Sequence, residues 1–288
     1  MRSCAPTSKP YGRCCEVSDE ADREFIALTA KIARDKGFGC ASYKEKCLRR
    51  RIAVRMRARG VHTYGDYARV LDTDGTEYER LLDALTINVT KLFRNWETYE
   101  VIAQKVVPVL WARSIPVINV WSAGCSSGEE PYSLAALFHR QAESVGELGD
   151  LVRRVRVLGS DIDARCLIDA ERGSFEEGDF ADTPNDLRHR YFAPSAPFTI
   201  IPDVKRLVRF ERRDLLAEEA PPGSHHLIVC RNVLIYFDRE TQERLFDKFH
   251  SALAPDGFLV LGKVETLLGA ARARFVAVDG RERVFRPI

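Results

Sequence analysis

The fold is decided by residues 117–138, which read VINVWSAGCSSGEEPYSLAALF. This segment begins with a short apolar run at 117–121, passes through a loop of small residues, and continues at Pro131 with helical spacing of its apolar residues. A buried strand, a tight loop and a helix in that order form the first part of a strand–helix–strand unit. The segment therefore predicts a parallel sheet covered by helices.

The same alternation continues toward the C-terminus. Apolar runs predict strands at residues 155–161, 226–230 and 258–262, and helical patterns occur at 132–141, 164–172 and 239–253. Strands this apolar are typical of sheets that helices cover on both faces. Residues 275–278 and 283–286 resemble a terminal antiparallel hairpin. The interval 173–213 is irregular, and we interpret it as a small insert with short β-like stretches.

The first third of the chain has no strand-like pattern. A polar, cysteine-rich start predicts a disordered tail over residues 1–17, and helical spacing begins at Ser18. Further helices are predicted at about 43–59, 64–71 and 77–85. We therefore expect a helical module at 18–86, a linker with a connecting helix at 87–115, and a sheet domain at 116–288.

Composition excludes several classes of protein. Hydrophobic residues make up 45% and charged residues 30% of the 288 residues, enough for a core and a charged surface. No stretch approaches the roughly 18 apolar residues that a membrane span requires, and the N-terminus has no apolar signal segment. We expect a cytoplasmic protein without membrane insertion. Its eight cysteines include no C-x-x-C pair, which favours reduced thiols and no metal site.

Positive charge is concentrated in one segment. Residues 31–60 hold eleven Lys and Arg against two acids, a net charge of +9, although the whole chain carries only +2. Such a segment should attract nucleic acid, anionic lipid or an acidic protein face. On the helix at 43–59, Leu48, Ile52 and Met56 would share the buried face. We expect the arginines spaced alongside them to form an exposed row: Arg51, Arg55 and Arg59.

The loop at 122–131 suits a nucleotide-like ligand. Ligands of open α/β sheets bind beyond the carboxyl ends of the strands, and small residues let them approach the backbone. No dinucleotide or P-loop motif occurs, and the acids Glu129 and Glu130 would repel a pyrophosphate. Asp161 ends the second strand and could bind ribose hydroxyls. S-adenosylmethionine, which is cationic and lacks phosphate, fits better than NAD or ATP. The alternative is a helix start with solvated acids.

Four stretches together resemble the chemotaxis receptor methyltransferase family (CheR), cytosolic enzymes that methylate glutamate side chains with S-adenosylmethionine. They are NVTKLFR at 88–94, WSAGCSSGEEPYSLA at 121–135, GSDID at 159–163 and CRNVLIYFDRETQ at 230–242. The resemblance extends over about residues 18–288. It implies an α/β fold: a Rossmann-like class I methyltransferase sheet with a small inserted β-unit, preceded by an all-helical, substrate-docking N-terminal domain.

The resemblance also implies roles for individual residues. Arg94 and Tyr236 would lie nearest the transferred methyl group and are the expected catalytic residues. For the cofactor's ammonium group, motif position favours Glu130 over Glu129. The residues expected to bind the cofactor are Asn88, Thr90, Arg94, Glu130, Asp161, Asp214, Leu215, Arg231 and Asn232. The partner would be the helical methylation region of a methyl-accepting chemotaxis receptor, and the enzyme would be a monomer that binds no nucleic acid.

Four departures from the family pattern occur. Leu92 occupies a position where Phe is common, and Asp214 one where Asn is frequent. Gly262-Lys263-Val264-Glu265 replaces a frequent Gly-His-Ser-Glu, with the glutamate kept. Residues 193–203 contain no glycine, whereas relatives that bind a receptor tail peptide have a glycine-containing loop in the insert. We therefore do not expect this chain to bind such a tail.

The implied reaction forms a glutamyl methyl ester for adaptation in bacterial chemosensory signalling. No general base is needed, because glutamate is ionised near pH 7. Catalysis then rests on alignment, with Arg94 orienting the carboxylate and Tyr236 donating a hydrogen bond. Two alternatives remain open: a nucleic-acid methyltransferase, which should carry an Asp/Asn-Pro-Pro-Tyr/Phe turn that is missing here, and a non-catalytic sensor of S-adenosylmethionine, which would not need both catalytic residues.

Overall fold

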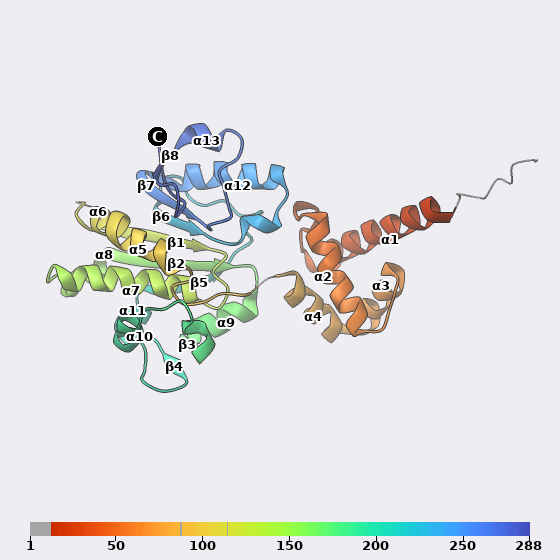
Figure 1. Cartoon of the computed structure of the whole chain (residues 1–288), viewed down its shortest axis with the longest axis horizontal. Coiled ribbons are helices and arrows are strands. Elements are labelled where there is room, and N and C mark those ends of the chain that lie inside the picture. The colour runs from red at the N-terminus through yellow and green to blue at the C-terminus, as the bar shows by residue number, and fades with distance from the viewer. Residues whose placement is uncertain (1–12, 87, 114) are drawn as a thin grey trace, which may run out of the picture. The chain divides into compact units, whose positions relative to one another are not determined.

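The computed structural model describes residues 13–86, 88–113 and 115–288, and the chain divides into two compact units, Met1–Ile87 and Asn88–Ile288 (Figure 1). Most of the tail predicted at 1–17 lies outside the described residues. Helix α1 (Arg13–Lys36), however, already begins before the expected start at Ser18. Its range contains neither Pro nor Gly, so nothing in that stretch stops a helix.

The first unit is helical, as predicted. After α1 it contains η1 (Cys40–Ser42), α2 (Glu45–Ala58), α3 (Tyr64–Thr73) and α4 (Gly75–Leu85). The side chains of Thr63 and Asp74 cap α3 and α4 by accepting hydrogen bonds from backbone N–H groups in the first turns. Apolar side chains of α1 to α4 form a core of their own, which includes Leu28, Ile52 and Leu81.

The prediction of an exposed row of arginines is wrong for Arg51 and Arg55. Arg59, the third member of the row, is exposed and lies 3.1 Å from the carboxylate of Asp74. Arg51 is buried and donates a hydrogen bond to the carbonyl oxygen of Leu85, at the C-terminus of α4. Arg55 binds the carboxylate of Glu77, which also belongs to α4. Helix α4 therefore covers Arg51 and Arg55 and supplies an acceptor to each. The basic side chains that α2 exposes are instead Lys46, Arg50 and Arg57.

A sheet of seven strands forms the centre of the second unit, in the order β5-β2-β1-β6-β7-β9-β8 (Figure 1). The strands are β1 (Ile118–Ala123), β2 (Val155–Asp161), β5 (Val208–Arg212), β6 (His225–Cys230), β7 (Leu253–Leu261), β8 (Phe275–Asp279) and β9 (Val284–Pro287). The first five run parallel, whereas β9 is antiparallel to both β7 and β8. The predicted parallel sheet and terminal hairpin are confirmed.

The insert is smaller than the predicted interval 173–213. Residues 208–212 form β5, which pairs in parallel with β2 at the edge of the main sheet. Its apolar residues, Val208 and Phe210, pack on the core. The remaining insert contains β3 (Ser174–Phe175), η4 (Glu177–Phe180), α10 (Asn185–Tyr191), β4 (Phe198–Thr199) and α11 (Pro202–Lys205). Strands β3 and β4 form a separate antiparallel sheet, which confirms a small inserted β-unit.

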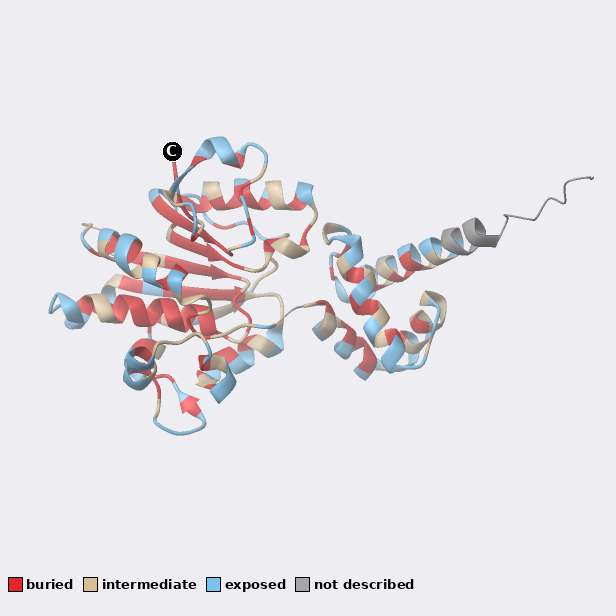
Figure 2. Ribbon diagram, in the orientation of Figure 1, coloured by how far each residue is buried: buried red, intermediate tan, exposed pale blue. Residues whose placement is uncertain are grey.

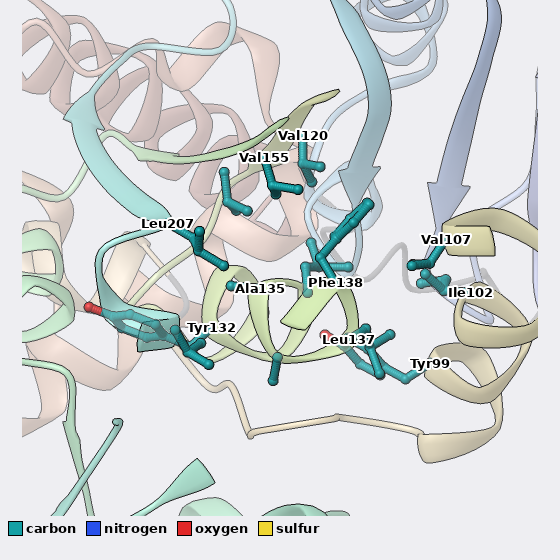
Figure 3. Close-up of a cluster of buried hydrophobic side chains, with 14 of the residues drawn as sticks. Tyr99, Ile102, Val107, Val120, Tyr132, Ala135, Leu137, Phe138, Val155 and Leu207 are labelled. Carbon is teal, nitrogen blue, oxygen red and sulfur yellow. The ribbon is translucent and has the colours of Figure 1, made fainter. Parts of the chain in front are cut away.

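Helices cover both faces of the main sheet, whose strands β1, β2, β6 and β7 are largely buried (Figure 2). Val120 of β1 lies in a cluster with α7, whereas its neighbour Trp121 stacks edge-on against Phe249 of α12 on the opposite face. Residues preceding β1 complete the first cluster, in which Tyr99 and Ile102 lie near α7 (Figure 3). The helices are α5 (Trp96–Val101), η2 (Ile102–Val106), α6 (Val107–Trp111), α7 (Glu129–Ser144), η3 (Leu148–Asp150), α8 (Leu151–Arg154), α9 (Ala164–Arg172), η5 (Leu234–Tyr236), α12 (Arg239–Ala252) and α13 (Ala271–Arg274).

No helix in the described part of the chain combines the length and the apolar character needed to cross a bilayer.

Candidate functional site

The loop after β1 is shaped by two glycines in the left-handed region. Gly124 has φ +82°, and a Cβ there would lie 2.5 Å from a methyl group of Val233, in the loop after β6. Gly128 has φ +95°, and its Cβ would lie 2.9 Å from the Cβ of Ala170 in α9. Only glycine fits either position. The loop is therefore packed between α9 and the loop that follows β6.

Asp161 ends β2 and holds this loop. One carboxylate oxygen accepts a hydrogen bond of 2.8 Å from the backbone N–H of Ser126, and the other accepts one of 3.0 Å from Asp163. Burial raises the pKa of Asp161, and these N–H donors oppose the shift. Each carboxylate oxygen retains a further lone pair. Asp161 thus lies where the sequence predicts it, and its binding of ribose stays a prediction.

Residues 88–95 run beside the loop after β1. The side chain of Asn88 donates a 2.8 Å hydrogen bond to Asp163, and the backbone carbonyl oxygen of Asn88 accepts one of 3.3 Å from the hydroxyl of Ser126. Asp163 also caps α9 by accepting from the backbone N–H of Arg165. The sequence motifs gave Asp163 no role in the candidate site. The signal that could have found it is its position directly before a helical pattern, which is typical of an N-cap residue.

Two buried glutamates begin α7. Glu130 accepts a 2.7 Å hydrogen bond from the hydroxyl of Ser122, whereas both carboxylate oxygens of Glu129 lie 2.9 Å from the hydroxyl of Ser127. Burial raises the pKa of Glu129 to about 7, and the hydroxyls of Ser127 and Thr90 act in the opposite direction. Thr90 thus belongs to the cluster around Glu129. The motif comparison favours Glu130 and gives Glu129 no role.

Arg231, directly after β6, joins the strand end to the segment 88–95. One terminal nitrogen donates to the carbonyl oxygen of Arg94 at 2.8 Å and to the side-chain oxygen of Asn95 at 3.2 Å. The other lies 3.8 Å from Glu130. Burial holds the pKa of Glu130 above its ordinary value, and the charges of Arg231 and Arg94 oppose that shift. The structure therefore brings together three predicted residues: Arg94, Glu130 and Arg231.

Asn232 has an unused hydrogen-bond acceptor. Its φ of +62° is in the left-handed region, and its backbone N–H donates to the carboxylate of Glu265. Its side-chain Oδ1 is buried and has no hydrogen-bond partner among the described residues. A buried acceptor without a partner is unfavourable, so an N–H or O–H donor of a ligand would be stabilised here.

Asp214 and Leu215 follow β5, next to the end of β2. The carboxylate of Asp214 accepts a 2.8 Å hydrogen bond from the N–H of Leu216, which closes a turn. The carbonyl oxygens of Leu215 and Glu218 each accept a 2.7 Å hydrogen bond from Lys248 of α12, which is buried. Lys248 thus fixes the segment that the resemblance assigns to the adenine. A lone lysine in an amphipathic pattern gives no sign of such a role.

Tyr236 ends η5, in the loop that also carries Arg231 and Asn232. Its side chain is half-buried. The structure thus places it on the segment that the motif predicts, and its position beside the transferred methyl group stays a prediction.

The site suits a ligand with a positive end and hydroxyl groups. Buried carboxylates at Glu129 and Glu130 and the unpaired oxygen of Asn232 favour cationic N–H donors, and Asp161 favours hydroxyls. The same acids disfavour a phosphate. These donors and acceptors fit S-adenosylmethionine.

Known proteins match the chain over most of its length. The family model described as CheR methyltransferase, all-alpha domain, matches residues 23–86, and the one described as CheR methyltransferase, SAM binding domain, matches residues 88–284. A chemotaxis protein methyltransferase from Listeria monocytogenes is 33% identical over 253 residues, which are 88% of this chain and 93% of that protein. One from Klebsiella aerogenes is 33% identical over 262 residues, which are 88% and 86% of the two chains.

Proposed function

Because the chain belongs to the CheR methyltransferase family, we propose that the residue cluster at the carboxyl ends of β1, β2 and β6 binds S-adenosylmethionine and aligns a receptor glutamate with it. The chain is an S-adenosylmethionine-dependent methyltransferase, a protein-glutamate O-methyltransferase that acts on chemotaxis receptors in adaptation.

One observation carries the assignment of the cofactor site: the buried Oδ1 of Asn232 has no hydrogen-bond partner in the part of the chain that the structure describes. Beside it, Arg231 lies 3.8 Å from the buried Glu130. An unpaired buried acceptor costs about 1–3 kcal/mol, which a bound donor would recover. The ammonium group at the methionine end of the cofactor supplies N–H donors together with the positive charge that suits Glu130. Asp161 would then bind the ribose, and Asp214 and Leu215 would flank the adenine.

When bound, S-adenosylmethionine supplies a methyl group on a positively charged sulfur. The residues of the chain position the acceptor. Arg94 orients the receptor carboxylate, and its guanidinium is itself held by a 2.9 Å hydrogen bond to the carbonyl oxygen of Val89. Tyr236 donates a hydrogen bond that fixes the carboxylate's direction. Alignment and exclusion of water suffice, because the glutamate is already ionised at pH 7. Esterification removes the charge that Arg94 binds, which favours product release.

We propose that the receptor docks on the exposed basic face of α2, defined by Lys46, Arg50 and Arg57. These residues are spaced four and seven apart, so they share one side of the helix. None of them forms an ion pair within the part of the chain that the structure describes, and Val54, which is 48% exposed, lies between them in sequence. This surface complements an acidic helical methylation region. We also propose that the enzyme is a monomer, that it works in the cytoplasm and that it binds no nucleic acid, as the resemblance to the family implies.

The test is transfer of labelled methyl groups from S-adenosylmethionine to receptor-containing membranes. Label that alkali releases as methanol supports a glutamyl ester. Alkali-stable label on RNA or DNA would instead identify a nucleic-acid methyltransferase. Binding of S-adenosylhomocysteine without any transfer would identify a non-catalytic sensor.

A further inference from the structure

Glu265, which follows β7, is only 4% exposed, and its carboxylate accepts three backbone hydrogen bonds. Oε2 accepts one of 2.6 Å from Gly262 and one of 3.1 Å from Asn232, and Oε1 accepts one of 3.3 Å from Ile235. Burial holds the pKa of Glu265 above its ordinary value, and these N–H donors oppose that shift. No ion pair among the described residues includes this carboxylate. Backbone amides therefore stabilise its charge.

The segment that Glu265 binds is the strand-end loop, which we define as residues 232–236. It begins with Asn232 and ends with Tyr236, two residues of the predicted site. Asn232 adopts a left-handed conformation, which an L-residue keeps only where its surroundings fix the backbone. Two of the three N–H groups that donate to Glu265 belong to this loop, so the carboxylate is such a constraint.

Close packing connects this contact to the rest of the site. A Cβ at Gly262 would lie 2.8 Å from Oε2 of Glu265 and 2.9 Å from the backbone nitrogen of Asn232, so glycine is required for the approach. On its other side the strand-end loop places Val233 against Gly124, in the loop after β1. A displacement of the strand-end loop would therefore disturb the loop after β1 as well as Asn232 and Tyr236.

We propose that Glu265 is a positioning residue of the methyltransferase, whose carboxylate fixes the strand-end loop so that Asn232 and Tyr236 stay in place at the cofactor. The inference rests on the proposed function of that loop. Glu265 contacts neither cofactor nor receptor glutamate in this scheme. It acts through the backbone N–H groups of Asn232 and Ile235.

The test compares Glu265→Gln with Glu282→Gln. The first change keeps the side-chain volume but replaces one acceptor oxygen with an NH2 group. At least one of the three backbone N–H donors then loses its acceptor. Glu282 is equally buried at 4%, accepts a 2.7 Å hydrogen bond from Thr98 and lies 3.5 Å from Lys263. Among the described residues, no hydrogen bond or ion pair joins it to the strand-end loop. We expect Glu265→Gln to weaken S-adenosylhomocysteine binding and to lower kcat by about tenfold or more each, the loss that one charged hydrogen bond implies. In Glu282→Gln both quantities should stay within about twofold, even where both variants lose similar thermal stability.

A second pair of measurements separates position from charge. Glu265→Asp keeps the charge but is too short to reach all three amides, so we expect it to be impaired like Glu265→Gln. Affinities for S-adenosylmethionine and S-adenosylhomocysteine should fall by the same factor, since the loop serves both. A wild-type-like Glu265→Asp, or a loss confined to the cationic S-adenosylmethionine, would overturn positioning in favour of a charge effect.

The remaining outcomes are also decisive. If Glu265→Gln does not fold, Gly262→Ala tests the same contact, because its Cβ would force the carboxylate away from Asn232, and binding should weaken. Wild-type affinity and kcat in a folded Glu265→Gln or Gly262→Ala variant would refute the positioning role. Failure of the wild-type protein to bind S-adenosylhomocysteine would refute the proposed function instead.

Discussion

The guanidinium of Arg55 binds the carboxylate of Glu77 through two parallel hydrogen bonds, 3.0 Å from Nε and 2.7 Å from Nη2. The side chain of Glu77 is fully buried, and the hydroxyl of Tyr67 donates a third bond of 2.8 Å. Burial raises the pKa of Glu77, but the donors outweigh it and the pKa lies below its ordinary value of 4.5. The pair joins α2 to α4, so it stabilises the helical unit and is not a docking surface.

Glu77→Gln should destabilise the helical unit by about 3 kcal/mol, the lower end for a broken buried pair, because Arg55 remains partly exposed. A lowered folded-state pKa contributes stability above the unfolded-state value and loses it as pH falls through the folded-state value. The difference between wild type and variant should therefore shrink below about pH 4.5. Urea unfolding at pH 7 and at pH 3.5 measures it. An unchanged difference at both pH values would contradict the ion pair.

The misplaced arginines show why some contacts could not be predicted from the sequence. Helical periodicity places Arg55 beside an apolar stripe, and without a known acceptor an arginine there is expected to face water. The acceptor is Glu77, 22 residues away on another helix. A pattern within one helix contains no information about which face a second helix covers.

Local signals, by contrast, were sufficient for most elements. Strand β2 begins and ends where its apolar run predicts, at 155–161. Strand β5 was missed as part of the main sheet because Arg209 and Glu211 alternate with only partly buried apolar residues. In the site, motifs locate the residues expected to touch the cofactor. Lys248, which holds two of the backbone carbonyls after β5, is defined by contacts with a distant segment that no motif contains. The family pattern includes Glu265, but it does not show that this carboxylate binds the backbone of Asn232 and Ile235.

Asp161→Ala should weaken the binding of S-adenosylhomocysteine by about 1.5–3 kcal/mol, the range for hydrogen bonds to a charged group. The carboxylate also holds the backbone N–H of Ser126, so part of the loss will come from the loop. Asp161→Asn keeps one acceptor oxygen and should lose less. Isothermal titration calorimetry measures both, and equal affinity of a folded Asp161→Ala variant and the wild type would remove Asp161 from the cofactor site.

Arg94→Ala should reduce turnover strongly while leaving most of the cofactor affinity. The bond from Arg231 goes to the backbone carbonyl of residue 94, so the alanine variant keeps this connection. Arg94→Lys should not restore full activity, because lysine lacks the planar fork that pairs with a carboxylate. The measurements are kcat in the methyl-transfer assay and affinity for S-adenosylhomocysteine. Full activity of the lysine variant would show that only the charge matters.

Glu129→Gln should stabilise the ligand-free protein increasingly as pH rises from about 4.5 to about 7. Burial raises the folded-state pKa of Glu129 to about 7, so its contribution to stability is complete below the ordinary value and is lost as pH rises through the folded-state value. Glutamine does not titrate and avoids this loss, which amounts to about 3 kcal/mol. Free energies of unfolding at pH 4.5, 6 and 8 measure it, and a pH-independent difference would mean that Glu129 is not titrated in this range.

The exposed basic face of α2 should attract the acidic receptor by its charge. Docking through exposed charge speeds encounter and is screened by salt, because the Debye length is about 8 Å at physiological ionic strength. Lys46→Glu combined with Arg50→Glu should raise the apparent KM for receptor several-fold and leave S-adenosylhomocysteine affinity unchanged. The control combines Arg69→Glu with Arg80→Glu, an equal change of charge at exposed positions of α3 and α4. Wild-type and control rates at low receptor concentration should fall as salt rises, whereas rates of the α2 variant should be nearly insensitive. If both double variants raise KM equally, the net charge of the unit attracts the receptor and the face of α2 has no special role.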